Sequence, residues 1–376
     1  MNVLRTDASA LIDGLHDPRF DPEDYLRERY ASRASRGIER LAAAYYRLKP
    51  LLPRSVQLAM RRRHAKRRAL RAFPRWPIED VLVRHQEESF RRAIRMSGGD
   101  SVPFVNFWPA GHRFAFVLTH DVEGPAGIAN IERVREVERA HGVVSSWNFV
   151  AEDYAIPEGL FEELRADGCE IGLHGIHHDR RLWRDEKTFE QTLPKIHRYL
   201  ADWQAVGWRS PVTYRNAEWM PRLGVLYDSS FPDTDPFEPQ PGGCCSIFPF
   251  LIDDLVELPI TLVQDHTMWE LLRRPGIDLW LEKSAWIRDH HGLVNLDSHP
   301  DYLIEQDRLD LYDQFLGWLT QLEGGWHALP RDVASWWKDR TKMEAFPDGV
   351  SVTGANGWDA TVAHAREAGD KIVYET

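Results

Sequence analysis

The sequence is poor in cysteine and has no long apolar run. Among 376 residues there are only three cysteines, Cys169, Cys244 and Cys245. An odd number with two neighbours is a poor disulfide framework, so it favours a reducing compartment. No stretch approaches the roughly 20 apolar residues that span a bilayer, and the N-terminus does not read as a signal peptide. We therefore expect a cytoplasmic protein.

The charge is distributed unevenly along the chain. The net charge is −11, but residues 1–105 hold 22 Lys or Arg and 13 Asp or Glu, which leaves +9 there and −20 in the remainder. An acidic main body argues against a nucleic-acid partner. Residues 55–73 read as a helix with seven cations between Arg61 and Arg71. This segment either contacts the inner face of an anionic membrane or is solvated and attracted to the acidic body.

Hydrophobic periodicity divides the chain into three predicted parts. Residues 1–105 form a helical N-terminal extension with helices over 37–73 and 78–96, and residues 341–376 form a β appendage. Between them, in 106–340, short apolar runs alternate with helical stretches. Strands are predicted at 114–119, 143–150, 169–173, 207–208, 225–226, 256–260 and 293–296, and helices at 131–140, 160–167, 188–204, 279–290 and 308–323. This alternation predicts an α/β fold with a parallel sheet, either a barrel or a doubly wound sheet.

Ionisable residues follow several of these predicted strands. The clusters are His120, Asp121 and Glu123; His174, His177, His178 and Asp179; Arg209 and Pro211; and Asp297, Ser298 and His299. In a parallel α/β barrel, the loops after the strands converge on one face and form the active site there. The four clusters are therefore expected to meet.

Two of the clusters have the composition of a metal site. His174 and His178 with one carboxylate suit zinc or a similar divalent ion and leave positions open for water and substrate. His177 competes with His178 as the second imidazole ligand. Of Asp121 and Glu123, one can ligate while the other acts as a general base. Arg209 can hold the base through a bidentate pair, and His299 can protonate a leaving amine.

The ordered motifs resemble those of the polysaccharide deacetylase family, also called the NodB-homology family or carbohydrate esterase family 4. They are THDVE (119–123), HGIHHD (174–179), WRSPVTYR (208–215) and LDSHPDY (296–302), within a region of about 110–335. The resemblance implies a distorted (β/α) barrel with one strand fewer than the eight-stranded form. It also implies a divalent metal and the hydrolysis of N-acetyl groups on amino sugars.

The resemblance also assigns roles to individual residues. Asp121 matches the catalytic base and Arg209 the arginine that braces it, while His174 and His178 match the metal ligands. His299 matches the general acid. Beside Pro211, the backbone N–H of Val212 matches the donor to the oxyanion.

The sequence departs from the family pattern at three places. The usual adjacent aspartates are replaced by Asp121-Val122-Glu123. Glu123 would then take the ligand position, or else Asp121 ligates and the base lies elsewhere. Asp297 replaces an apolar residue. No aspartate that orients His299 is evident, although Asp228 and Asp233 are candidates that we also predict to contact substrate.

The sequence therefore predicts a hydrolase that removes an N-acetyl or similar N-acyl group from an amino sugar, using zinc or else cobalt, nickel or manganese. A cytoplasmic location favours a nucleotide- or lipid-linked sugar as substrate. A deformylase or another C–N amidohydrolase is one alternative. A catalytically inactive carbohydrate-binding barrel is another.

Overall fold

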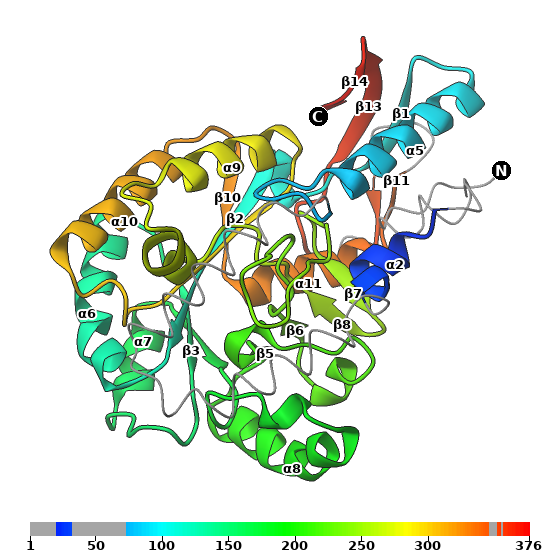
Figure 1. Cartoon of the computed structure of the whole chain (residues 1–376). Helices are drawn as coiled ribbons and strands as arrows, with labels where there is room; N and C mark the ends of the chain where they lie inside the picture. The colour runs from blue at the N-terminus through cyan, green and yellow to red at the C-terminus, as the bar shows by residue number, and fades with distance from the viewer. Residues whose placement is uncertain (1–19, 32–72, 346–351, 355) are drawn as a thin grey trace.

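The structure, a computed structural model, describes residues 20–31, 73–345, 352–354 and 356–376 (Figure 1). The helices predicted over 37–73, including the basic segment 55–73, lie outside the described residues except for Phe73. Within the described part of the chain, no helix has both the length and the apolar composition needed to cross a bilayer. Cys169, Cys244 and Cys245 are all buried free thiols.

A curled sheet of parallel strands forms the centre of the molecule. Neighbouring strands pair in the order β9-β2-β3-β4-β5-β6-β8, and all six of these pairings are parallel. The strands are β2 (Phe114–Val122), β3 (Ser146–Phe149), β4 (Glu170–Leu173), β5 (Gly207–Trp208), β6 (Tyr227–Asp228), β8 (Leu255–Glu257) and β9 (Leu293–Ser298). Two edge strands are added, β7 (Phe250–Ile252) antiparallel to β8 and β10 (Gly325–His327) parallel to the start of β2.

Hydrogen bonds beyond the strand ends connect the two sides of this sheet. The backbone N–H groups of Thr261 and Leu262, which follow β8, donate to the carbonyl of Asn295 in β9 at 3.2 and 3.1 Å. The Thr261 hydroxyl also donates to the carbonyl of Leu293 at 2.7 Å. With β10, the described sheet therefore holds eight parallel strands, and hydrogen bonds connect the segment after β8 with β9. This arrangement confirms the predicted distorted (β/α) barrel.

Helices cover the outside of the sheet, and they begin where the sequence offers capping residues. Asp185 caps α8 by accepting from the backbone N–H of Thr188 at 2.8 Å, and Pro125 opens α6 at a position where a missing N–H has no cost. The covering helices are α6 (Pro125–Ala140), α7 (Leu160–Ala166), α8 (Glu186–Asp202), α9 (Asp278–Asp289), α10 (Gln306–Leu319) and α11 (Pro330–Arg340).

Short helical turns connect several of these elements. They are η3 (Pro109–Gly111), η4 (Arg181–Trp183), η5 (Pro211–Thr213), η6 (Met220–Leu223) and the π-helical η7 (Thr267–Leu272). The predicted strand at 225–226 lies two residues later, as β6, and the other predicted barrel strands overlap the observed ones. The longest strand, β2, is buried at all nine positions, which explains its nearly continuous apolar sequence.

The strand before the barrel and the strands after it form a small sheet beside the barrel. β1 (Ser101–Val105) pairs antiparallel with β13 (Val362–Ala368), which pairs with β14 (Lys371–Glu375). The helix α5 (Val81–Ser97) packs on it, with the Phe90 ring 5.4 Å from that of Tyr374. The remaining elements are α2 (Pro22–Leu26), η1 (Arg29–Ala31), β11 (Glu344–Ala345) and β12 (Val352–Thr353). The predicted N-terminal extension and β appendage thus share one sheet.

Glu170, at the start of β4, is a buried carboxyl group at the opposite end of its strand from His174. Its oxygens accept from the Tyr227 hydroxyl at 2.7 Å and from the backbone N–H of Arg331 at 3.1 Å. Burial raises the pKa of Glu170 from its ordinary 4.5 to about 7. The folded protein therefore keeps this proton at pH values where the unfolded chain has lost it.

This proton makes the stability depend on pH. Because the pKa is higher in the folded state, the stabilisation is complete below pH 4.5 and is lost as the pH rises to about 7, by roughly 3 kcal/mol. Glu170→Gln, which is always neutral, should gain stability relative to the unchanged protein between pH 5 and pH 8. Thermal unfolding at both pH values measures this difference. An identical pH dependence in both proteins would contradict it.

Candidate active site

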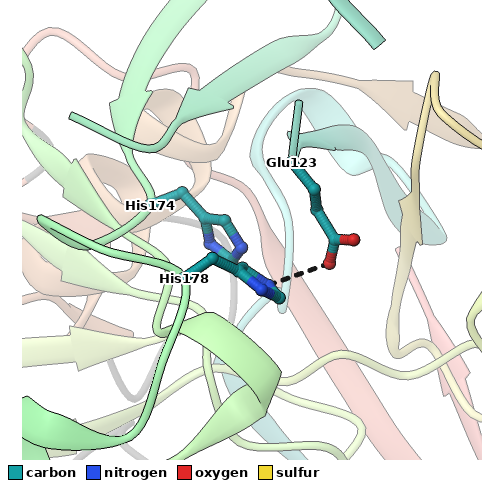
Figure 2. A group of neighbouring side chains, drawn as sticks. All are labelled: Glu123, His174 and His178. Carbon is teal, nitrogen blue, oxygen red and sulfur yellow. Dashed lines mark ion pairs between the residues drawn. The ribbon is translucent and has the colours of Figure 1, made fainter. Parts of the chain in front are cut away.

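Three predicted ligands come together at the carboxyl ends of β2 and β4. The side chains of Glu123, His174 and His178 each offer an atom within 4.8 Å of the others (Figure 2). His178 Nε2 lies 2.9 Å from Glu123 Oε1. This contact is an ion pair without the alignment of a hydrogen bond, and the Nε2 atoms of His174 and His178 are both buried with no hydrogen-bond partner. Two unsatisfied imidazole nitrogens beside a carboxylate fit a divalent cation.

The protonation states of His174 and Glu123 also suit a metal site. Burial acts to lower the pKa of His178, but Glu123 outweighs it and raises this pKa. Burial lowers the pKa of His174 to about 4, so its ring is neutral at neutral pH. Burial acts to raise the pKa of Glu123, but His178 and His299 outweigh it and hold this pKa well below its usual range. His174 Nδ1 lies 3.1 Å from the carbonyl of Arg209, to which it can donate, and this contact leaves Nε2 available for an ion. A neutral imidazole and an ionised carboxylate are the forms that bind metals.

The neighbouring histidine points elsewhere. His177 Nδ1 lies 2.7 Å from Asp153 Oδ1, and its Nε2 lies 3.5 Å from Glu152 Oε2. The backbone N–H of His178 donates to the other oxygen of Asp153 at 2.7 Å. Asp153 therefore fixes the loop so that His178, and not His177, faces Glu123.

Asp121 lies on the other side of His174 from the unpartnered nitrogens. Its Oδ2 is 3.5 Å from His174 Nδ1 and 3.7 Å from Arg209 Nη1, and its Oδ1 accepts from the Asn148 amide at 2.9 Å. Burial acts to raise the pKa of Asp121, but His174, Arg209 and His299 outweigh it and lower this pKa. Asp121 is therefore an ionised carboxylate beside His174 and Arg209.

Asp121 also belongs to a second acidic group, with Asp297 and His299, whose ligand atoms lie within 4.8 Å of one another. Arg209 Nη1 already lies 2.6 Å from Asp297 Oδ2. Burial acts to lower the pKa of His299, but Asp265, Asp297 and Glu123 raise it well above 6.5, so this ring is a cation. The cationic Arg209 and His299 already neutralise the carboxylates of this second group, which disfavours a further cation there.

His299 is oriented by an aspartate that the sequence analysis did not single out. Asp265 accepts from the backbone N–H of His299 at 2.8 Å, and its other oxygen lies 2.7 Å from His299 Nδ1. The opposite nitrogen, Nε2, lies 3.7 Å from Glu123 Oε1. The signal was available, because Asp265 follows the predicted strand 256–260 and the same strand-end rule applies to it.

Asp228 and Asp233, the earlier candidates for this role, make their contacts inside the protein. Asp228 accepts from the Ser230 hydroxyl at 2.6 Å, and Asp233 lies 2.7 Å from Lys283 Nζ. Both side chains are buried. Neither contacts His299 in the hydrogen bonds and ion pairs of the described residues.

Pro211 and Val212 form a sharp turn after β5. Val212 and Thr213 have φ values of 56° and 50°, in the left-handed region that β-branched residues rarely adopt. Each such residue costs on the order of 1–3 kcal/mol, so the surroundings must hold the turn. Gly175 (φ 76°) allows a close approach, because a Cβ there would lie 2.7 Å from Pro211 Cγ. The turn therefore packs directly against the loop of residues 174–176, which begins with His174.

Asp301, to which the sequence analysis gave no role, connects the motif at 119–123 with the motif at 296–302. Asp301 accepts from the backbone N–H of Glu123 at 3.1 Å and from that of Gly127 at 3.0 Å. Gly127 has no room for a side chain, since a Cβ would lie 2.1 Å from Asp301 Oδ2. Asp301 thus fixes the loop that presents Glu123.

No protein-family model matches the chain, and neither does any curated protein. Among solved structures, a protein described as a polysaccharide deacetylase of Mycobacterium smegmatis is 20% identical, with 61% of this chain and 91% of that chain covered and a TM-score of 0.48. A protein of Pseudomonas aeruginosa PAO1, also described as a polysaccharide deacetylase, is 17% identical, with 61% of this chain and 92% of that chain covered and a TM-score of 0.48. The Puue allantoinase is 16% identical, also with 61% and 92% covered and a TM-score of 0.48.

The ligand set predicts which variants lose metal. His174→Ala removes a buried imidazole nitrogen that has no other partner, so affinity for zinc should fall by more than the ~10–100-fold that is typical of lost second-shell contacts. Glu123→Ala should have a similar effect. Equilibrium dialysis with Zn²⁺ measures both. His177→Ala is the matched control and should keep its zinc. If His177→Ala loses zinc while His174→Ala and Glu123→Ala keep it, the assignment of Glu123, His174 and His178 as the ligands is wrong.

Proposed function

We propose that this protein is a metal-dependent hydrolase that removes an N-acetyl or similar N-acyl group from an amino sugar. The observation that carries the proposal is the convergence of Glu123, His174 and His178 within 4.8 Å, beside an ionised Asp121 and a cationic His299. The ordered motifs of the deacetylase family supply the reaction class.

Glu123, His174 and His178 are the residues that would hold the ion. When bound, a divalent ion lowers the pKa of a water molecule and polarises an acyl carbonyl. Asp121 accepts the proton of the attacking water, and Arg209 and Asn148 keep its carboxylate in place. The water oxygen then bonds to the acyl carbon. The charge that develops on the carbonyl oxygen is stabilised by the backbone N–H of Val212.

The C–N bond breaks as the leaving nitrogen accepts a proton from His299. Asp265 holds Nδ1 of this ring, so the opposite nitrogen, Nε2, faces the site as the donor. The products are a carboxylate and a free amine. Asp121 and His299 thus perform opposite proton transfers, because one is surrounded by cations and the other by carboxylates.

We further propose that the amino sugar is linked to a nucleotide or a lipid and that the reaction takes place in the cytoplasm, at the inner face of the membrane. The basic composition of residues 61–71 motivates this proposal.

Activity measurements on two residues test the chemistry. Asp121→Asn removes the base and His299→Ala the acid, and each should lower kcat by about 100-fold or more while zinc content stays unchanged. His177→Ala should retain the activity. Release of acetate and formate is measured from N-acetyl and N-formyl amino sugars, as oligosaccharides and as nucleoside-diphosphate conjugates. Formate release alone would identify a deformylase.

A different outcome would overturn the proposal. A protein that binds these sugars without zinc and releases no acid would be a carbohydrate-binding barrel. Full activity in Asp121→Asn would place the base elsewhere.

A further inference from the structure

The described N-terminal segment, residues 20–31, contacts the barrel at several points, among them Arg27 Nη2, which lies 3.4 Å from Asp253 Oδ1. Leu26 of α2 is buried in the same hydrophobic cluster as Leu173 of β4 and Trp208 of β5. These two residues immediately precede His174 and Arg209. One hydrophobic cluster therefore includes a residue of this segment and the two residues that precede His174 and Arg209.

A buried ion pair extends this contact to the loop after β5. Arg215 donates to both oxygens of Glu28, from Nε at 2.6 Å and from Nη2 at 2.5 Å. The two residues are 187 positions apart in the sequence. The Glu28 side chain is 8% exposed and the Arg215 side chain 0%. A bidentate pair of this kind fixes the orientation as well as the position of the guanidinium.

The same guanidinium holds the strained turn. Arg215 Nη1 donates to the carbonyl of Thr213 at 2.8 Å and to that of Gln240 at 3.3 Å. Thr213 directly follows Val212, and both have left-handed backbone angles. Such angles persist only where the surroundings determine them, and here the Arg215 contact is one such constraint.

A second contact from this segment is made with the loop that contains Gly242 and Gly243. The Tyr30 hydroxyl donates to the carbonyl of Gly243 at 2.6 Å. At Gly242, a Cβ would lie 2.9 Å from Glu28 Oε1 and 3.3 Å from the Tyr30 hydroxyl, so the loop backbone approaches both side chains closely. Glu28 is thus enclosed between Arg215 and this loop.

We propose that Glu28 is a positioning residue of the active site. It acts through Arg215 on the Val212–Thr213 turn, so that the N-terminal segment completes a site whose reacting groups all come from the barrel. The inference rests on the proposed function, in which the Val212 N–H stabilises the oxyanion. It gives part of residues 1–105 a role in the reaction.

The full-length protein and four variants test this role. Glu28→Gln keeps the shape but removes the charge, Glu28→Ala removes the contact, and Glu28→Asp keeps the charge on a shorter arm. Glu23→Gln is the matched control, because Glu23 lies in the same segment and its ion pair among the described residues is with its neighbour Arg27, at 2.6 Å. Acetate release gives kcat and KM, zinc content is measured, and hydrogen exchange is followed for residues 210–216.

Glu28→Gln and Glu28→Ala should lower kcat by about 10-fold or more, with KM and zinc content little changed, since a displaced oxyanion donor affects the transition state more than binding. Exchange at 210–216 should accelerate in both. Glu28→Asp should recover part of kcat, and Glu23→Gln should match the unchanged protein.

Two results would overturn the proposal. One is unchanged exchange at 210–216 in Glu28→Ala, and the other is an equal loss of kcat in Glu23→Gln. If the unchanged protein releases no acid from any probe, the proposed function fails, and the exchange measurement still decides whether Glu28 holds the turn. If Glu28→Ala does not fold, Glu28→Gln and Glu28→Asp provide the same comparison.

Discussion

The arrangement of the site depends on one buried cation, the guanidinium of Arg209. Its Nη1 lies 2.6 Å from Asp297 on β9 and 3.7 Å from Asp121 on β2, and its Nη2 donates to Thr119 on β2 and Ser229 after β6. Its own carbonyl lies 3.1 Å from His174 Nδ1. Removing one partner from a buried ion pair typically costs about 3–5 kcal/mol. Arg209 therefore joins several strands and holds the carboxylates of Asp121 and Asp297 close to the loop that carries His174.

Around this cation, each residue takes its role from its neighbours. Asp121 is surrounded by Arg209, His174 and His299, so its carboxylate is favoured. His299 is surrounded by Asp265, Asp297 and Glu123, so its imidazolium is favoured. Opposite charge environments only a few ångströms apart are what a hydrolase requires in order to accept a proton at one point and deliver one at another.

The spacing of the first motif follows from strand geometry. Asp121 lies within β2, and its neighbour His120 points to the other face, where it contacts Glu138 at 2.7 Å. Side chains alternate along a strand, so Asp121 and Glu123 face the same side although Val122 separates them. The Asp-Val-Glu departure from the family pattern therefore keeps both carboxylates at the site. Glu123 lies beside the imidazoles of His174 and His178, and Asp121 lies beside Arg209.

The sequence by itself determined the parallel α/β barrel and most of the residues that meet at its rim. Asp121, Glu123, His174, Arg209 and His299 could be found because each lies at the end of an apolar run, and the ends of parallel strands converge. Only the tertiary structure decided between His177 and His178, because adjacent residues in a loop face different ways once Asp153 fixes the backbone. It also supplied Asp265 for His299 and Glu28 for Arg215, across 34 and 187 residues. No local pattern encodes such pairs, because they depend on how distant loops pack together.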